Sequence, residues 1–240
     1  MSKMLAVVAG GGIAISVVCL GFAATIDDFS PGGLFSRCGA PTGDVGVNGT
    51  REIAWESDSD EVTINVPSTV TYRPGSGTML IARGSPEMLG HLRVRGRRIE
   101  FDCRGWNLGG DLELTLPGQP LNDFTLNGRG HLVLENINTR ELDVSIHGKG
   151  EVEATGTADD VDLTMAGDGE AHLGKLAAKS VEVRIAGNGD AEIAPQDEAE
   201  IMIAGSGEIR LLTRPPRLEQ MIFGSGKIVQ PPPETPASAP

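Results

Sequence analysis

Aromatic residues are scarce in this chain: its 240 residues include 2 Trp, 1 Tyr and 6 Phe. A core of ordinary size therefore has to be filled mainly by Val, Ile, Leu and Ala. Basic residues are also outnumbered, with 20 Lys and Arg against 33 Asp and Glu, so the net charge is −13. This balance argues against nucleic acid as the main partner, because phosphate contacts require Lys and Arg.

Glycine, by contrast, is abundant, at 33 of the 240 residues. Glycine weakens helices, so a compact helical bundle is disfavoured. The glycines do not follow the strict three-residue period of collagen, and the charged content of 22% argues against full disorder. The length allows one or two domains with a sizeable core.

An apolar run of 20 residues extends from Leu5 to Ala24, after Lys3 and before Asp27. A helix of this length can cross about 30 Å of hydrocarbon, whereas Ala23 supplies the small residue that precedes signal cleavage. Residues 1–25 are therefore predicted as a signal peptide or an N-terminal membrane anchor, and both alternatives stay open. Either places the rest of the chain outside the cytoplasm, in the periplasm or at the cell surface, and an uncleaved segment would anchor it in the inner membrane.

Cys38 and Cys103 are the two cysteines outside this apolar run. Disulfides persist in oxidising compartments, so this pair is predicted to form a bridge that stabilises the fold by roughly 3–4 kcal/mol. Two free buried thiols are the alternative. Neither cysteine lies in a CxxC or zinc-ligand spacing, so no metal or redox cofactor is assigned.

A Gly-x-Gly motif recurs six times in the second half of the chain. The pairs are Gly128/Gly130, Gly148/Gly150, Gly167/Gly169, Gly187/Gly189, Gly205/Gly207 and Gly224/Gly226, and their first glycines are 20, 19, 20, 18 and 19 residues apart. A nearly constant period of about 20 residues is typical of a solenoid.

Apolar and polar residues alternate on both sides of each glycine pair, as in Val183-Arg184-Ile185 before Gly187. Alternation with a period of two predicts strands with one buried face. Each unit is therefore interpreted as a strand, a glycine corner, a second strand and a polar turn, with turns at residues 136–140, 156–160 and 174–179. Units that stack in register form an all-β, single-stranded parallel β-helix. Its corners require glycine because the backbone there needs positive φ or a close approach to the next coil.

Residues 45–230 are predicted to form one β-helix domain, preceded by a linker at 26–44. Its first part, up to about residue 119, carries weaker repeats and is interpreted as irregular early coils or as a small sheet that caps the solenoid. The dipeptide Ser85-Pro86 is expected in a turn. Residues 231–240 include five prolines and are predicted to be a disordered tail.

The repeated segments Ile185–Ala191, Ile203–Ile209 and Ile222–Ile228 carry a family resemblance, together with Leu112–Pro117. With them, the chain resembles the bacterial putative auto-transporter adhesin family with the head GIN domain, over roughly residues 45–229. The resemblance implies an exported β-helical domain with an adhesin-like role. It supplies no catalytic or cofactor-binding residues.

Stacked coils would place equivalent residues in rows. The first row is Asp123, Asp143, Asp162, Glu182, Glu200 and Glu219; the second is His131, Glu151, Glu170, Asp190, Glu208 and Lys227; the third is Val133, Glu153, His172, Glu192, Arg210 and Val229. Like charges about 4.8 Å apart repel one another. The acidic rows are therefore interpreted either as a cation-binding or adhesive face, or as a solvated surface that keeps a repetitive β-protein soluble.

A short basic stretch stands out in this acidic protein: Arg93, Arg95, Arg97, Arg98 and Arg104. It is interpreted either as a site for an acidic glycan or lipid head group, or as a set of partners within the chain for the acidic rows.

Enzymatic motifs are missing from the sequence: it contains no GxSxG and no HExxH, and its four histidines show no paired spacing. The expected function is therefore non-enzymatic: an adhesin-like or cell-envelope binding module whose partner is a surface glycan or protein. A glycan-active envelope enzyme that uses pairs of acids, or a purely structural scaffold, are the alternatives.

Overall fold

The computed structural model describes residues 43–55, 59–103 and 111–232. The predicted signal or anchor segment, Cys38 and most of the predicted tail lie outside these ranges. Within them, no helix is both long and apolar enough to cross a membrane.

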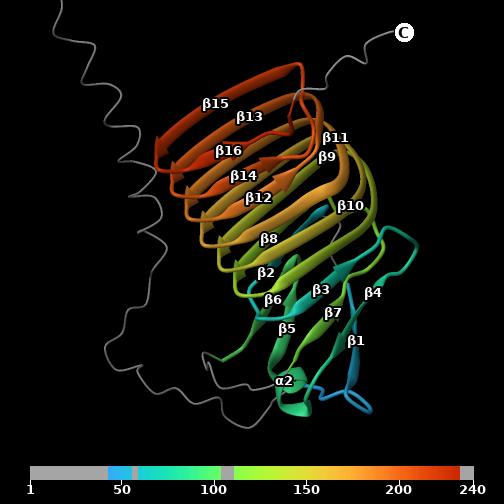
Figure 1. Ribbon diagram of the computed structural model, residues 1–240. Helices are drawn as coiled ribbons and strands as arrows, with labels where there is room; N and C mark the ends of the chain where they lie inside the picture. Colours follow the sequence, from blue (N-terminus) through green and yellow to red (C-terminus); the bar gives the residue numbers. More distant parts are fainter. Residues whose placement is uncertain (1–42, 56–58, 104–110, 233–240) are drawn as a thin grey trace, which may run out of the picture. The chain divides into compact units, whose positions relative to one another are not determined.

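The second half of the described chain is a β-solenoid of about five turns (Figure 1). Its strands are β8 (Asp123–Gly128), β9 (His131–Gly148), β10 (Glu151–Gly167), β11 (Glu170–Gly187), β12 (Asp190–Ile193), β13 (Pro195–Gly205), β14 (Glu208–Leu211), β15 (Arg217–Gly224) and β16 (Lys227–Val229). Strands of successive coils pair in parallel, as β9 does with β10 and β10 with β11. The predicted all-β solenoid is confirmed.

Aliphatic side chains stack in columns inside the coils. One column contains Leu126, Ile146, Met165, Ile185 and Ile203, which are neighbours in register from one coil to the next and are all buried. Such columns explain how a core forms with few aromatic residues, because each side chain packs on its equivalent in the coil below.

The glycine corners bring successive coils into close contact. Gly205 has φ +148°, and a Cβ on it would lie 1.9 Å from the carbonyl oxygen of Gly187. The second glycine of the same motif meets a different obstacle, since a Cβ on Gly207 would lie 2.1 Å from the carbonyl oxygen of Gly189. The first position therefore needs glycine for both φ and space, and the second needs it for space.

At three of the second glycines the atom nearest to an added Cβ differs from one coil to the next. These glycines are Gly130, Gly150 and Gly226, and none of them has positive φ. The atom nearest to an added Cβ belongs to the backbone at Gly130 and to a side chain at the other two. A Cβ on Gly150 would lie 2.5 Å from Leu126 Cδ2, and one on Gly226 would lie 2.6 Å from Ile203 Cγ2, in each case a core side chain of the preceding coil. At Gly130 the nearest atom is the carbonyl oxygen of Ser68, at 3.0 Å. At Gly150 and Gly226 the stacked core side chains of the preceding coil therefore leave no room for a Cβ.

The polar segments predicted as turns lie within long strands, so that part of the prediction was wrong. β9, β10 and β11 are 18, 17 and 18 residues long. The chain changes direction inside them at residues with positive φ, Asn136 at 54° and Gly156 at 125°. Parallel pairing continues through these bends with a register shift, because each bent segment follows its equivalent in the next coil.

The first half of the described chain combines both interpretations, early coils and a cap. Its elements are β1 (Thr50–Ala54), β2 (Glu61–Ile64), β3 (Thr69–Tyr72), β4 (Met79–Arg83), α2 (Pro86–His91), β5 (Leu92–Arg95), β6 (Arg98–Phe101) and β7 (Glu113–Thr115). β2 and β3 form early coil segments, since they pair in parallel with β8 and β9. β1, β4 and β7 pair antiparallel, as do β5 and β6, and these strands with α2 form the cap.

The helix α2 replaces the turn expected at Ser85-Pro86. Ser85 is its N-cap, where the hydroxyl accepts a hydrogen bond from the backbone N–H of Met88, and Pro86 occupies the first turn. Ser followed by Pro is a helix start as well as a turn signal, and here burial of Met88 and Leu89 in the core favours the helix.

Candidate functional site

Two outward-facing strips of polar side chains meet at the glycine corners. The strip that precedes the corners, called here the long acidic row, contains Glu61, Asp123, Asp143, Asp162, Glu182, Glu200 and Glu219. Each member lies opposite the next in the strand register, so the predicted row is confirmed. It is one residue longer than expected, because Glu61 on β2 continues it into the early coils.

Partial burial and repulsion raise the pKa values of three members of the long acidic row. Burial, followed by the negative charges of Asp162, Glu141 and Asp123, raises the pKa of Asp143 to about 6. Burial is also the main cause that raises the pKa values of Asp123 and Glu182, and neighbouring carboxylates add to it. Asp143 therefore retains its proton in weakly acidic conditions.

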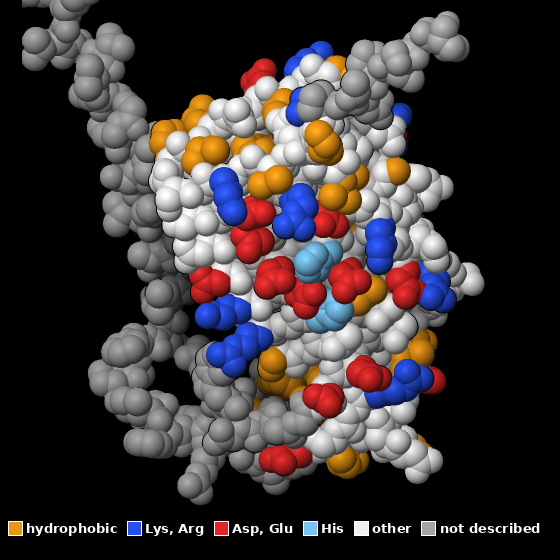
Figure 2. All heavy atoms as spheres, viewed as in Figure 1, with side chains coloured by type: hydrophobic (Ala, Val, Ile, Leu, Met, Phe, Trp, Pro, Cys, Tyr) orange, Lys and Arg blue, Asp and Glu red, His pale blue; other side chains and the backbone are white. Residues whose placement is uncertain are grey.

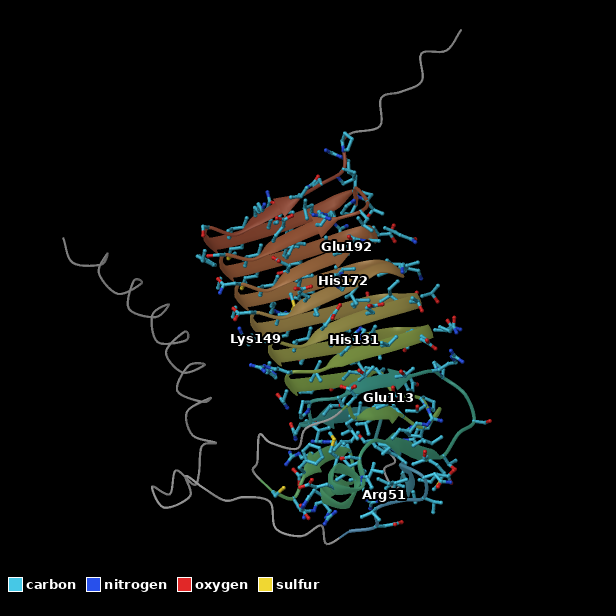
Figure 3. All side chains as sticks on the ribbon, turned by 60° about the horizontal axis from the view of Figure 1, so that its bottom comes forward. Arg51, Glu113, His131, Lys149, His172 and Glu192 are labelled. Atoms are coloured by element: carbon cyan, nitrogen blue, oxygen red, sulfur yellow. The ribbon has the colours of Figure 1, made fainter. Side chains whose placement is uncertain are left out.

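The strip that follows the corners carries histidines among its carboxylates. This histidine–carboxylate face contains His131, Glu151, Glu153, Glu170, His172 and Glu192. Figure 2 shows histidine side chains in the middle of a carboxylate patch, with basic side chains at its borders. Figure 3 shows His131, His172 and Glu192 one after another along the stack, with Glu113 beyond His131.

Strand register brings these residues together on β9, β10 and β11. His131 lies opposite Glu151, which lies opposite Glu170, and Glu153 lies opposite His172. The closest polar contacts run diagonally, with 3.3 Å between His131 Nε2 and Glu153 Oε1 and 3.4 Å between His172 Nε2 and Glu151 Oε1. His172 Nε2 also lies 3.6 Å from Glu170 Oε2 on its own strand.

Towards the C-terminal coils the same strip is neutralised by basic residues. Glu208 lies 3.4 Å from Arg210 and 2.5 Å from Lys227, measured between the charged atoms. A shallow depression between this neutralised part and the histidines is lined by Glu170, His172, Asp190, Glu192, Glu208 and Arg210. Negative charge is thus concentrated around the two histidines.

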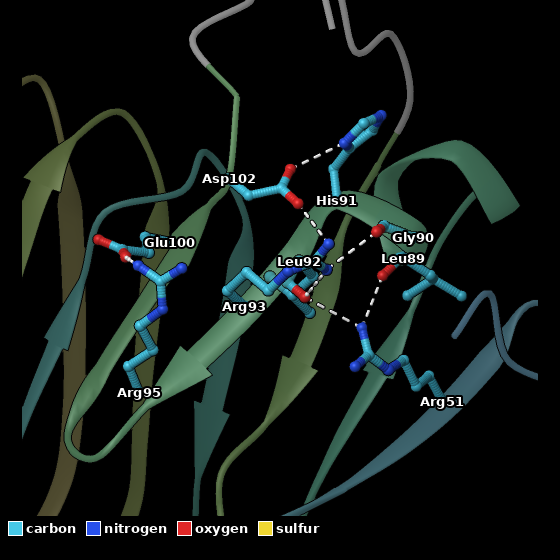
Figure 4. Close-up of polar contacts among 9 residues, drawn as sticks. All are labelled: Arg51, Leu89, Gly90, His91, Leu92, Arg93, Arg95, Glu100 and Asp102. Carbon is cyan, nitrogen blue, oxygen red and sulfur yellow. Dashed lines mark hydrogen bonds and ion pairs between the residues drawn. The ribbon is translucent and has the colours of Figure 1, made fainter. Parts of the chain in front are cut away.

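The basic stretch is paired within the chain, as the second of its two interpretations predicts, but Arg93 and Arg95 pair with carboxylates outside the acidic rows. Arg93 pairs with Asp102, Arg95 with Glu100 at 2.9 Å, and Arg97 with Glu61 of the long acidic row at 2.8 Å. Figure 4 shows the first two pairs beside α2.

Arginine side chains also satisfy carbonyls at the C-terminal end of α2. Arg51 donates to the carbonyl oxygens of Leu89 at 2.7 Å and Leu92 at 3.0 Å, and Arg93 donates to that of Gly90 at 2.9 Å (Figure 4). These arginines therefore hold the cap together. Arg104 lies outside the described residues.

The other candidates from the sequence lie apart from the histidine–carboxylate face. Cys103 follows β6 in the cap and is not a free thiol, while Cys38 lies outside the described residues, so their pairing stays a prediction. His91 is buried beside Asp102, with 2.8 Å between Nδ1 and Oδ1.

The position of His131 and His172 on either side of Glu151 was not predicted from the sequence. The signal for it is their separation of 41 residues, which is two coils plus two positions along a strand.

Comparison with known proteins agrees with this architecture. Residues 100–215 match the family model described as "Putative auto-transporter adhesin, head GIN domain". Residues 100–215 are therefore similar to this family, and the resemblance seen in the Gly-x-Gly segments is confirmed. The matched range is shorter than the 45–229 expected. No curated protein matches the sequence.

A solved structure shows the same fold at low sequence identity. A putative adhesin from Bacteroides fragilis is 19% identical with a TM-score of 0.59, and the match covers 75% of this chain and 95% of that one. A putative lipid binding protein from Parabacteroides distasonis is 19% identical with a TM-score of 0.48, covering 76% and 96%. A putative adhesin from Parabacteroides merdae is 17% identical with a TM-score of 0.46, covering 76% and 95%.

Proposed function

We propose that this chain is a non-enzymatic, adhesin-like binding module that acts outside the cytoplasm, in the periplasm or at the cell surface. Its partner would be a glycan or protein of the cell envelope or of another surface. The match of residues 100–215 to a family model described as an adhesin domain supports this role, as does the name of the similar adhesin from Bacteroides fragilis. The apolar N-terminal run supports the location.

The observation that carries the proposal is the histidine–carboxylate face. Its polar side chains project from paired strands, which hold them at fixed separations and leave them accessible: His172 is 47% exposed and Glu170 is 62% exposed. A rigid, open strip of hydrogen-bonding groups suits a polar extended ligand, because little ordering entropy is lost when the ligand binds.

A glycan array with the purified chain tests this function. We expect binding to a subset of envelope or surface glycans, and weaker binding after the charge reversal Glu192→Lys on the face. The matched control is Glu200→Lys, which reverses an exposed charge on the long acidic row and should leave binding unchanged. Absence of binding to every glycan and to every envelope protein tested would refute the adhesin-like role and favour a scaffold.

A glycan-active enzyme is the second candidate, and one observation favours it. Asp143, with its pKa raised to about 6, lies opposite Asp162 on the adjacent strand, so two carboxyl groups stand next to each other. Such a pair can act as general acid and base on a glycosidic bond. Release of reducing sugar from envelope polysaccharides, abolished by Asp143→Asn, would support the enzyme over the binding module.

A further inference from the structure

The histidine–carboxylate face brings two imidazoles to one carboxylate. Glu151, on β10, has neighbours on both adjacent strands: His131 on β9 and His172 on β11. Two sets of potential metal ligands have Glu151 in common. In each set, one ligand atom from each residue lies within 4.8 Å of the ligand atoms of the other two. The first set is His131, Glu151 and Glu153; the second is Glu151, Glu170 and His172.

The separations between these ligand atoms resemble those around a bound metal ion. The three measured nitrogen–oxygen distances are 3.3, 3.4 and 3.6 Å. Ligands at 2.0–2.2 Å from a tetrahedral Zn²⁺ are about 3.4 Å apart. Small rotations of the exposed Glu side chains are therefore enough to bring each set onto one ion.

A second observation concerns the imidazole of His131. Its Nε2 atom is shielded from solvent and makes no hydrogen bond, although Glu153 lies 3.3 Å away. A shielded polar atom without a hydrogen bond costs free energy, and a metal ion bound at Nε2 would remove that cost. The ion would also relieve the repulsion between Glu151, Glu153 and Glu170.

We propose that this part of the face is a binding site for a divalent transition-metal ion, with Zn²⁺ the ion best matched by its ligands. Imidazole nitrogen combined with carboxylate oxygen suits Zn²⁺, whereas Ca²⁺ and Mg²⁺ prefer oxygen ligands alone. Glu151 is the central ligand, because it belongs to both sets. The site goes beyond the proposed function: it depends only on residues of β9, β10 and β11 and needs no surface ligand.

Isothermal titration of the purified chain with Zn²⁺ alone tests the site, after any affinity tag is removed. We expect saturable binding with a dissociation constant in the micromolar range, and binding of Ca²⁺ and Mg²⁺ at least tenfold weaker. Absence of saturable Zn²⁺ binding would overturn the proposal, and so would equal affinity for Ca²⁺.

Variants locate the ion on the face. Glu151→Gln weakens both sets and should lower Zn²⁺ affinity at least tenfold. His131→Gln leaves the second set intact and should have a smaller effect, whereas the double variant His131→Gln/His172→Gln should lose the site. Glu200→Gln, an exposed acid on the long acidic row and in neither set, is the matched control and should bind Zn²⁺ like the parent.

These outcomes separate the metal site from the adhesin-like role. Unchanged Zn²⁺ affinity in both Glu151→Gln and the double variant would show that the ion binds elsewhere and would sink the assignment. Circular dichroism of each variant without metal checks that the solenoid is folded. Zn²⁺ binding without any glycan binding would leave the metal site standing while the proposed function fails.

Discussion

Gly205 illustrates how a single residue limits the approach of two coils. Its φ of +148° and the 1.9 Å separation between an added Cβ and the Gly187 oxygen are both incompatible with alanine. We expect Gly205→Ala to lower the free energy of unfolding by roughly 2–4 kcal/mol, through backbone strain and displacement of the coil below. Chemical denaturation followed by circular dichroism measures the change.

The control for this substitution is Gly75→Ala. Gly75 has no positive φ in the range that disfavours side chains, and nothing lies within 4 Å of the position that an added methyl group would take. Its substitution should change the free energy of unfolding by less than about 0.5 kcal/mol. Equal effects at the two positions would contradict the corner argument.

Asp143 makes stability depend on pH. Its pKa is raised to about 6 in the folded state, so the folded protein holds this proton more tightly than the unfolded chain does. The contribution to stability is present below the unfolded pKa of about 3.9 and is lost as the pH rises through about 6. Asp143→Asn should therefore raise the melting temperature at pH 7 to 8 and flatten its decline between pH 4 and 7.

Melting curves across this pH range measure the effect, and Glu52→Gln on the exposed side of β1 is the control. A constant offset between Asp143→Asn and the parent at every pH would show that proton binding at Asp143 does not contribute.

At the scale of elements, α2 depends on its N-cap. The Ser85 hydroxyl satisfies the backbone N–H of Met88, and the helix that it starts buries Met88 and Leu89. Ser85→Ala should cost about 1 kcal/mol of stability, whereas Ser85→Asp keeps an acceptor and should retain it. Denaturant titration of the two variants provides the comparison, and equal losses would mean that the cap bond is not the cause.

The elements differ in how far the sequence predicts them. Corners and strands of the solenoid are predictable because glycine and period-two alternation act locally and recur in every coil. α2 is not, since Ser85-Pro86 starts a turn or a helix equally well and the burial of Leu89 decides between them. The bends at Asn136 and Gly156 were predicted as turns, because pairing with the next coil is invisible in a single repeat.

The candidate site was predicted in part for the same reason. The residues of each row follow from counting positions after the glycine corner. The contact between His172 and Glu151 is diagonal and joins two rows, so it requires side-chain directions as well as the coil period. Counting alone identifies His131 and His172 as members of different rows. It does not predict that both lie beside Glu151.

For the described chain as a whole, the coil is the unit of stability. Deletion of Lys149–Gly167 removes 19 residues, one coil, and joins Gly148 directly to Asp168-Gly169 so that a Gly-x-Gly corner is restored. We expect this shortened protein to fold with an all-β circular dichroism spectrum, because each coil contacts only its neighbours. Its melting transition measures how much stability one coil contributes.

The control removes half as much. Deletion of Lys149–Thr157 takes out 9 residues and leaves the corner glycines of adjacent coils out of register. This protein should fail to fold. If both deletions behaved alike, in-register stacking would not be what stabilises the solenoid.

In-register stacking also has a geometric consequence for the face. Separation along the stack changes only in whole steps of the strand spacing, about 4.8 Å, while the direction of each side chain is preserved. Insertion of a coil between β9 and β11 would move His131 and His172 apart by one step without turning either ring. Duplication or loss of the stretch of DNA that encodes one coil can therefore change the distance between ligand groups in whole steps of the strand spacing.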